Sequence, residues 1–139
     1  MPTERKPTSA PGGKAAILIV EPDVIVRLSL AEYLRDCHHL VFEVHCAEDA
    51  LAIFESGRNV DIVLAEVQLP GAMSGFDLAK KLRAEHPAVG IILTSTAQGA
   101  AQKAGELCDD GPIQKPYEPA DVLRRINLLR ERKRTSKSD

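Results

Sequence analysis

At the centre of this sequence, an apolar run leads into a carboxylate and then a Pro/Gly turn: Ile62-Val63-Leu64-Ala65-Glu66-Val67-Gln68-Leu69-Pro70-Gly71. The apolar part predicts a buried strand, and the turn marks the carboxyl end of that strand. Ligands of open α/β sheets bind at the carboxyl ends of the strands, so Glu66 is the first candidate for a functional residue.

Strands and helices alternate on both sides of this run. Further apolar segments predict strands at residues 15–20, 40–46, 89–94 and 112–114. Helical patterns cover residues 24–34 (inward face Val24, Leu28, Ala31 and Leu34), 48–56, a segment from Ser74-Gly75 to just before Pro87, 98–107, and 119–134 (inward face Val122, Ile126 and Leu129). This alternation predicts an α/β domain with a parallel sheet covered on both faces.

Length and composition fit one soluble domain. The 139 residues can bury a core without disulfides, and no apolar run approaches the roughly eighteen residues of a membrane span. We predict a disordered leader at residues 1–13, a folded domain at residues 14–134 and a disordered tail at residues 135–139. The amino terminus lacks the apolar segment of a secretory signal, which favours a cytoplasmic protein. Three cysteines without paired spacing argue against a disulfide frame or a zinc site.

Polar residues follow several of the predicted strands. Parallel strands end on the same edge of a sheet, so these residues should meet there. They are Glu21 and Asp23, Glu66, Thr94 with Ser95 and Thr96, and Lys115.

Four short motifs occur in an order and spacing that point to one family: Ile17-Leu18-Ile19-Val20-Glu21, Val63-Leu64-Ala65-Glu66-Val67-Gln68-Leu69-Pro70, Leu93-Thr94-Ser95 and Gln114-Lys115-Pro116-Tyr117. With them the chain resembles a response-regulator receiver domain of two-component signalling, over roughly residues 15–134. The resemblance implies a single flavodoxin-like (βα)5 domain with a parallel five-stranded sheet of order 2-1-3-4-5.

The resemblance also implies a site. In that family an aspartate after the third strand accepts a phosphoryl group from a partner's phosphohistidine, and an acidic pair after the first strand holds Mg²⁺. A Ser or Thr and a Lys contact the phosphoryl oxygens, and the Lys-Pro bond is usually cis. Carried over, Glu21 is the first acidic position, Thr94 the hydroxyl, Lys115 the lysine, and the Gln68 carbonyl a backbone metal ligand.

Three positions depart from this pattern. Glu66 stands at the phosphoacceptor position and is one methylene longer than aspartate. Pro22 stands at the second acidic position and offers no side-chain oxygen, although Asp23 is adjacent. Pro112 stands where the family generally has an aromatic residue whose rotamer reports activation. No cofactor is therefore expected, and any Mg²⁺ binding is expected to be weak.

Each candidate also has an ordinary structural interpretation. Lys115 could be a solvated lysine that fits its turn, and Thr94 a strand-end residue with β propensity. Glu21 and Asp23 could be acids at a helix start, where the helix dipole favours them. The basic residues near the carboxyl end fit a solvated helix end better than a nucleic-acid site, because no aromatic platform accompanies them.

These observations leave three functional hypotheses. The first is a stand-alone, non-enzymatic receiver that acts through protein contacts, with Glu66 supplying a permanent charge. The second is a phosphorelay receiver that still accepts a phosphoryl group. The third, a nucleotide- or flavin-binding domain, lacks a Gly-rich phosphate loop. Expected partners are a histidine kinase, another response regulator, or a second copy in a homodimer through residues 98–107, 112–114 and the helix at 119–134.

Overall fold

The computed structural model describes residues 13–95 and 111–138, with side chains described as far as residue 133. Five strands and four helices lie in this part of the chain. The strands are β1 (Ala16–Val20), β2 (Leu40–Val44), β3 (Ile62–Glu66), β4 (Gly90–Ser95) and β5 (Ile113–Gln114). The helices are α1 (Val24–Asp36), α2 (Ala47–Glu55), α3 (Gly75–Glu85) and α5 (Pro119–Ser138). The helix predicted at residues 98–107 lies outside the described residues.

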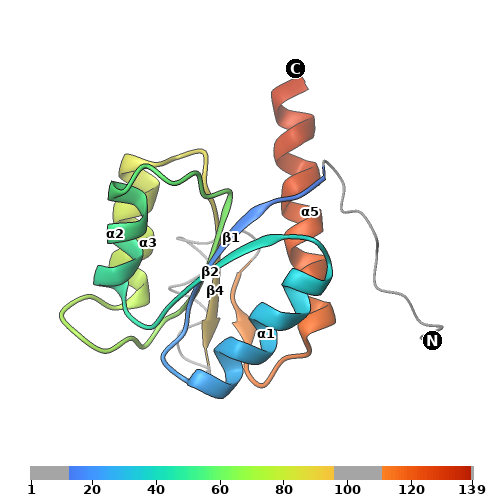
Figure 1. The fold of residues 1–139 in the computed structure, drawn as a ribbon. Helices are drawn as coiled ribbons and strands as arrows, with labels where there is room; N and C mark the ends of the chain where they lie inside the picture. Colours follow the sequence, from blue (N-terminus) through green and yellow to red (C-terminus); the bar gives the residue numbers. More distant parts are fainter. Residues whose placement is uncertain (1–12, 96–110, 139) are drawn as a thin grey trace.

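The strands form one parallel sheet in the order β2-β1-β3-β4-β5, which confirms the predicted fold class and strand order. Figure 1 shows α2 and α3 on one face of this sheet and α1 and α5 on the other. Successive residues of a strand point to opposite faces. Accordingly, Ile17 and Ile19 of β1 join the core cluster that includes residues of α1 and α5, whereas Leu18 and Val20 join the cluster that includes residues of α2 and α3.

The inward face of α5 is as predicted, with Val122, Ile126 and Leu129 buried. The end of this helix was predicted wrongly. It continues to Ser138, so residues 135–138 are helical and not a disordered tail. The residues just before that stretch are mostly Arg, Lys and Glu, which are good helix formers even when solvated.

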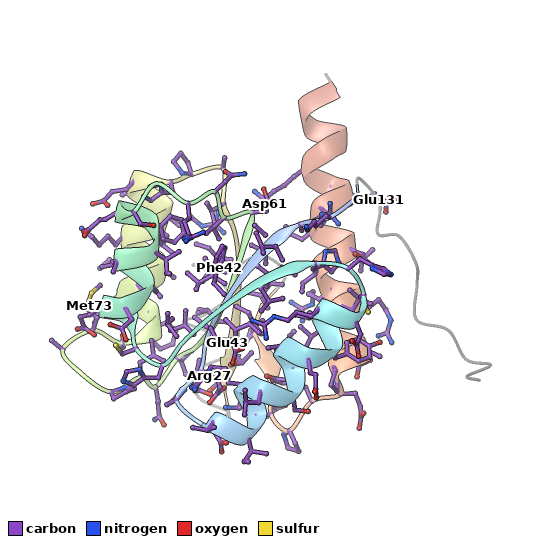
Figure 2. All side chains as sticks on the ribbon, in the orientation of Figure 1. Arg27, Phe42, Glu43, Asp61, Met73 and Glu131 are labelled. Carbon is purple, nitrogen blue, oxygen red and sulfur yellow. The ribbon has the colours of Figure 1, made fainter. Side chains whose placement is uncertain are left out.

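The predicted inward face of α1 is wrong in its first half. Val24 and Leu28 are 52% and 51% exposed, and the buried residues are Leu30, Ala31 and Leu34. Arg27 explains the rotated face, because it turns toward the sheet and donates a 2.7 Å hydrogen bond to the Glu21 carbonyl. It also approaches Glu43 of β2, with 3.4 Å between Arg27 Nε and Glu43 Oε1 (Figure 2).

Within the described residues, none of the helices is both long enough and apolar enough to cross a membrane. The other element boundaries differ from the predicted ones by one or two residues, as helix and strand ends commonly do.

Candidate functional site

The carboxyl ends of β1, β3 and β5 bring Glu21, Glu66 and Lys115 together. Glu66 is the last residue of β3, and Glu21 follows β1, where its N–H donates to the Val44 carbonyl of β2. Lys115 follows β5, and its N–H donates to the Ser95 carbonyl of β4. The backbone of the sheet therefore fixes all three residues at one edge, as predicted.

Lys115 forms a bridge between the two carboxylates. Its Nζ lies 2.8 Å from Glu21 Oε1 and 2.8 Å from Glu66 Oε1. The three side chains are largely buried, with 14% of Lys115, 4% of Glu21 and 6% of Glu66 exposed. Lys115 is thus not a solvated lysine of the turn, and we refer to these three residues as the Glu–Lys–Glu cluster.

The cluster sets the charge of the lysine. Burial by itself lowers the pKa of Lys115, but the hydrogen bonds to Glu21 and Glu66 and their negative charges raise it. The net result is a Lys115 pKa above the ordinary value. Lys115 is therefore protonated at neutral pH and donates to both carboxylates.

Backbone N–H groups hold the second oxygen of each carboxylate. Glu21 Oε2 accepts from the Asp23 N–H at 2.9 Å, and Glu66 Oε2 accepts from the Gln68 N–H at 3.1 Å. All four carboxylate oxygens thus have a donor. Carboxylates are ligands that Mg²⁺ prefers, but an ion here would compete with the Lys115 ammonium, which already supplies positive charge to both of them.

Close packing of α3 fixes the chain that follows Glu66. The Gly75 N–H donates to the Val67 carbonyl at 2.8 Å, and a Cβ on Gly75 would collide with the Glu66 carbonyl oxygen. Ser74 and Asp77 form a capping box at the start of the same helix. Glycine is therefore the residue that lets α3 begin against the backbone of Glu66.

The remaining predicted site residues take different places. Thr94 of β4 is buried and pairs with Glu66 of β3. The Thr94 carbonyl accepts a hydrogen bond from the Val67 N–H. Asp23 is the N-cap of α1 and accepts from the N–H groups of Ile25 and Val26, which is the helix-start interpretation. Gln68 is exposed and contributes its N–H to Glu66. Pro22 and Pro112 are both half-buried.

Asp61 directly precedes β3 and therefore lies at the opposite edge of the sheet, away from any nucleophile position. Its carboxylate accepts from the Ala16 N–H at 2.8 Å, and Figure 2 shows it far from Arg27, which marks the edge with the cluster.

Sequence reasoning did not single out two residues beside the cluster. Arg27 donates to the Glu21 carbonyl, although the helical pattern of the sequence predicted that Val24 and Leu28, not Arg27, would face inward at the start of α1. Tyr117 packs against the core, and burial, together with the charge of Glu21, raises the pKa of its phenol to about 12. Its place in the motif Gln114-Lys115-Pro116-Tyr117 was the available signal. The Lys115–Pro116 peptide bond is cis, as the resemblance implies.

A parallel sheet of this order, with two acidic residues and a lysine gathered at the carboxyl ends of its strands, is the arrangement of a receiver domain of two-component signalling. The chain belongs to the response regulator receiver domain family, whose sequence model matches residues 17–127.

Relatives and solved structures agree with this assignment. The chain is 35% identical to the sensory transduction protein RegX3 of Mycolicibacterium smegmatis over 118 residues, which are 84% of this chain and 51% of RegX3. It is 33% identical to a cyclic di-GMP phosphodiesterase of Thermotoga maritima over 102 residues, 72% of this chain and 27% of that protein. The chain thus spans about half or less of the length of these relatives.

A CheY-like receiver domain structure from Methanospirillum hungatei superposes with a TM-score of 0.81 at 23% identity, covering 89% of this chain and 99% of that one. The BeF3-activated DrrB receiver domain superposes with a TM-score of 0.74 at 22% identity, covering 85% and 98%. These structures support the fold.

Proposed function

We propose that this receiver domain acts as a non-enzymatic protein-binding module in which Glu66 holds the signalling edge in one charge state. The observation that carries the proposal is the bridge from Lys115 Nζ to Glu66 Oε1 at 2.8 Å. The family resemblance places an aspartate nucleophile at this position and a phosphoryl contact at the lysine. Here the glutamate already satisfies the lysine, without a phosphoryl group.

The hydrogen bonds of the cluster oppose phosphoryl transfer. Phosphoryl transfer needs a carboxylate positioned in line with the phosphorus, and Mg²⁺ must neutralise the transferred oxygens. Hydrogen bonds to both Glu66 oxygens and both Glu21 oxygens hold these carboxylates in their present orientation, and the Lys115 ammonium occupies the space between them. Pro22 adds no ligand, and the carboxylate of Asp23 caps α1. We therefore expect weak Mg²⁺ binding and no uptake of phosphate.

The decisive experiment compares the protein with variants that restore the family pattern. The full chain, Glu66→Asp and Glu66→Asp/Pro22→Asp are incubated with acetyl phosphate and Mg²⁺, and intact mass is measured. We expect no added phosphate on the parent protein and a Mg²⁺-dependent mass increase on the double variant. A stable increase on the parent, located at Glu66, would instead establish the phosphorelay hypothesis.

The proposed partners are cytoplasmic signalling proteins, such as a histidine kinase, another response regulator or a second copy of the chain. The exposed side of α5 offers a surface for such contacts, with Leu128 48% exposed and Arg124 paired only to Asp121 on the same helix among the contacts described. If this surface carries a homodimer, Arg124→Glu should weaken self-association in sedimentation equilibrium. Arg125 is a poor choice for this test, because it also donates to the Gly111 carbonyl and supports the fold.

A further inference from the structure

We propose that His45, Cys46 and Asp49 form a binding site for a zinc ion at the start of α2, separate from the Glu–Lys–Glu cluster. An imidazole nitrogen, a thiol sulfur and a carboxylate oxygen from these residues lie within 4.8 Å of one another. Nitrogen, sulfur and oxygen donors of these three kinds make up the usual ligand set of protein-bound zinc.

The local backbone explains why three donors meet on so short a segment. Cys46 is the N-cap residue of α2 and has an extended backbone, with φ −144° and ψ 165°. Its side chain makes no capping hydrogen bond, so the thiol does not serve the helix terminus. The first turn of α2 then carries Asp49 to the same side as His45, four positions earlier. This arrangement leaves the thiol next to the other two donors.

The spacing of two donors already fits a tetrahedral ion. Zinc ligands at about 2.0–2.1 Å, separated by a tetrahedral angle, lie about 3.4 Å from each other. His45 Nδ1 and Asp49 Oδ2 are 3.4 Å apart. The thiol sulfur lies within 4.8 Å of a ring nitrogen of His45 and of a carboxylate oxygen of Asp49, so the third donor stands beside the other two.

The neighbouring carboxylate is engaged elsewhere. Glu48 Oε2 accepts from the Ala72 N–H at 3.2 Å, in the loop between β3 and α3. The site therefore has three protein ligands, and a water molecule would complete the coordination, as in open zinc sites. The side chains of His45 and Asp49 are 59% and 54% exposed, so an ion has free access.

Binding would change the protonation of the thiol. The S–H bond of Cys46 breaks, the sulfur donates its electron pair to the metal, and the proton leaves to solvent. The soft sulfur and the imidazole favour zinc over Mg²⁺, which prefers oxygen ligands. The sequence predicted no zinc site, because the three cysteines lack paired spacing. The site proposed here uses only one cysteine, together with His45 and with Asp49 of the first turn of α2.

The test uses the full chain, reduced and metal-free. Zn²⁺ alone is titrated into the protein in a calorimeter at pH 7.5, and Co²⁺ is added in parallel as a spectroscopic probe. We expect one equivalent of Zn²⁺ to bind, with proton release, and Co²⁺ to give a thiolate-to-metal charge-transfer absorption. Cys46→Ser should abolish that absorption, and His45→Gln and Asp49→Asn should each weaken Zn²⁺ binding about tenfold or more.

His38→Gln is the matched control, because His38 is an exposed histidine outside the site. It should leave both signals unchanged. Circular dichroism checks that each variant is folded, and if Cys46→Ser is not, the His45 and Asp49 variants decide alone. Absence of the Co²⁺ absorption, its persistence in folded Cys46→Ser, or equal Zn²⁺ affinity in the parent and the His45 and Asp49 variants would overturn the proposal.

Discussion

Replacement of Lys115 by methionine tests whether the Glu–Lys–Glu cluster holds the edge of the sheet together. The change removes the positive charge and keeps a chain of similar length. Glu21 Oε1 and Glu66 Oε1 each lie 2.8 Å from Nζ, so they are at most twice that distance, about 5.6 Å, from each other. Without the lysine, two buried carboxylates would face each other.

The size of the effect follows from that separation. Two unit charges about 5.6 Å apart repel by about 3 kcal/mol at an effective dielectric constant of about 20. Loss of one partner from a buried ion pair costs about 3–5 kcal/mol, which is the same range. We therefore expect Lys115→Met to lower the free energy of unfolding by about 3 kcal/mol at pH 7.5.

The pH dependence identifies the cause. In the variant the two carboxylates repel each other in the folded state, so protonation of one of them relieves the repulsion. The folded variant then takes up protons more readily than the unfolded chain, so the stability it lost is partly regained as pH falls. Urea unfolding followed by circular dichroism at pH 7.5 and 5.5 should show a smaller deficit at the lower pH.

Lys115→Met/Glu66→Gln provides the control, because it removes one of the two negative charges. It should be more stable than Lys115→Met alone at pH 7.5. The reasoning fails if Lys115→Met is within about 0.5 kcal/mol of the parent protein at both pH values, as expected for a solvent-screened surface pair.

Three further predictions concern the scaffold, and urea unfolding measures each of them. Gly75→Ala should lose about 1–3 kcal/mol through the collision with the Glu66 carbonyl, although alanine is the better helix former; a gain would show that α3 can move away. His38 has a φ of 74° just after α1, so His38→Gly should gain up to about 1 kcal/mol, and a loss would contradict strain there. Burial and the charges of Arg130 and His38 lower the pKa of His39 below 6.5 in the folded protein. The unfolded chain therefore binds more protons than the folded protein at this residue, and the free energy of unfolding should fall as pH drops below about 6.5. His39→Gln should flatten this dependence, and an unchanged slope would assign it to other groups.

Much of the fold was predictable because apolar runs followed by turns mark buried strands and their ends. The same logic placed Glu21, Glu66 and Lys115 at one edge, since parallel strands end together. Periodicity failed where a polar side chain packs inward. Arg27 takes the inward position at the end of the first turn of α1, where its side chain reaches the Glu21 carbonyl and Glu43. Val24 and Leu28 face solvent instead.

The roles of neighbouring acids were harder to predict. Glu21 and Asp23 are two residues apart, yet Glu21 is a buried partner of Lys115 and Asp23 is an exposed helix cap. The Asp23 N–H donates to the Glu21 carboxylate, so the backbone turn decides which acid faces the lysine. A sequence pattern gives the residue types of such a turn but does not show which way its side chains point.

The length of Glu66 has a consequence for its proposed role. One carboxylate oxygen reaches Lys115 from the end of β3, while the other turns back to the Gln68 N–H of the following loop. The second contact depends on the position of the loop, which Gly75 helps to fix by packing against the Glu66 backbone. An aspartate is one methylene shorter and is expected to lose one of the two contacts, leaving Lys115 a freer donor. On the proposed function, Glu66→Asp therefore changes two properties together, since it supplies the family nucleophile and also releases the lysine that a phosphoryl group would need.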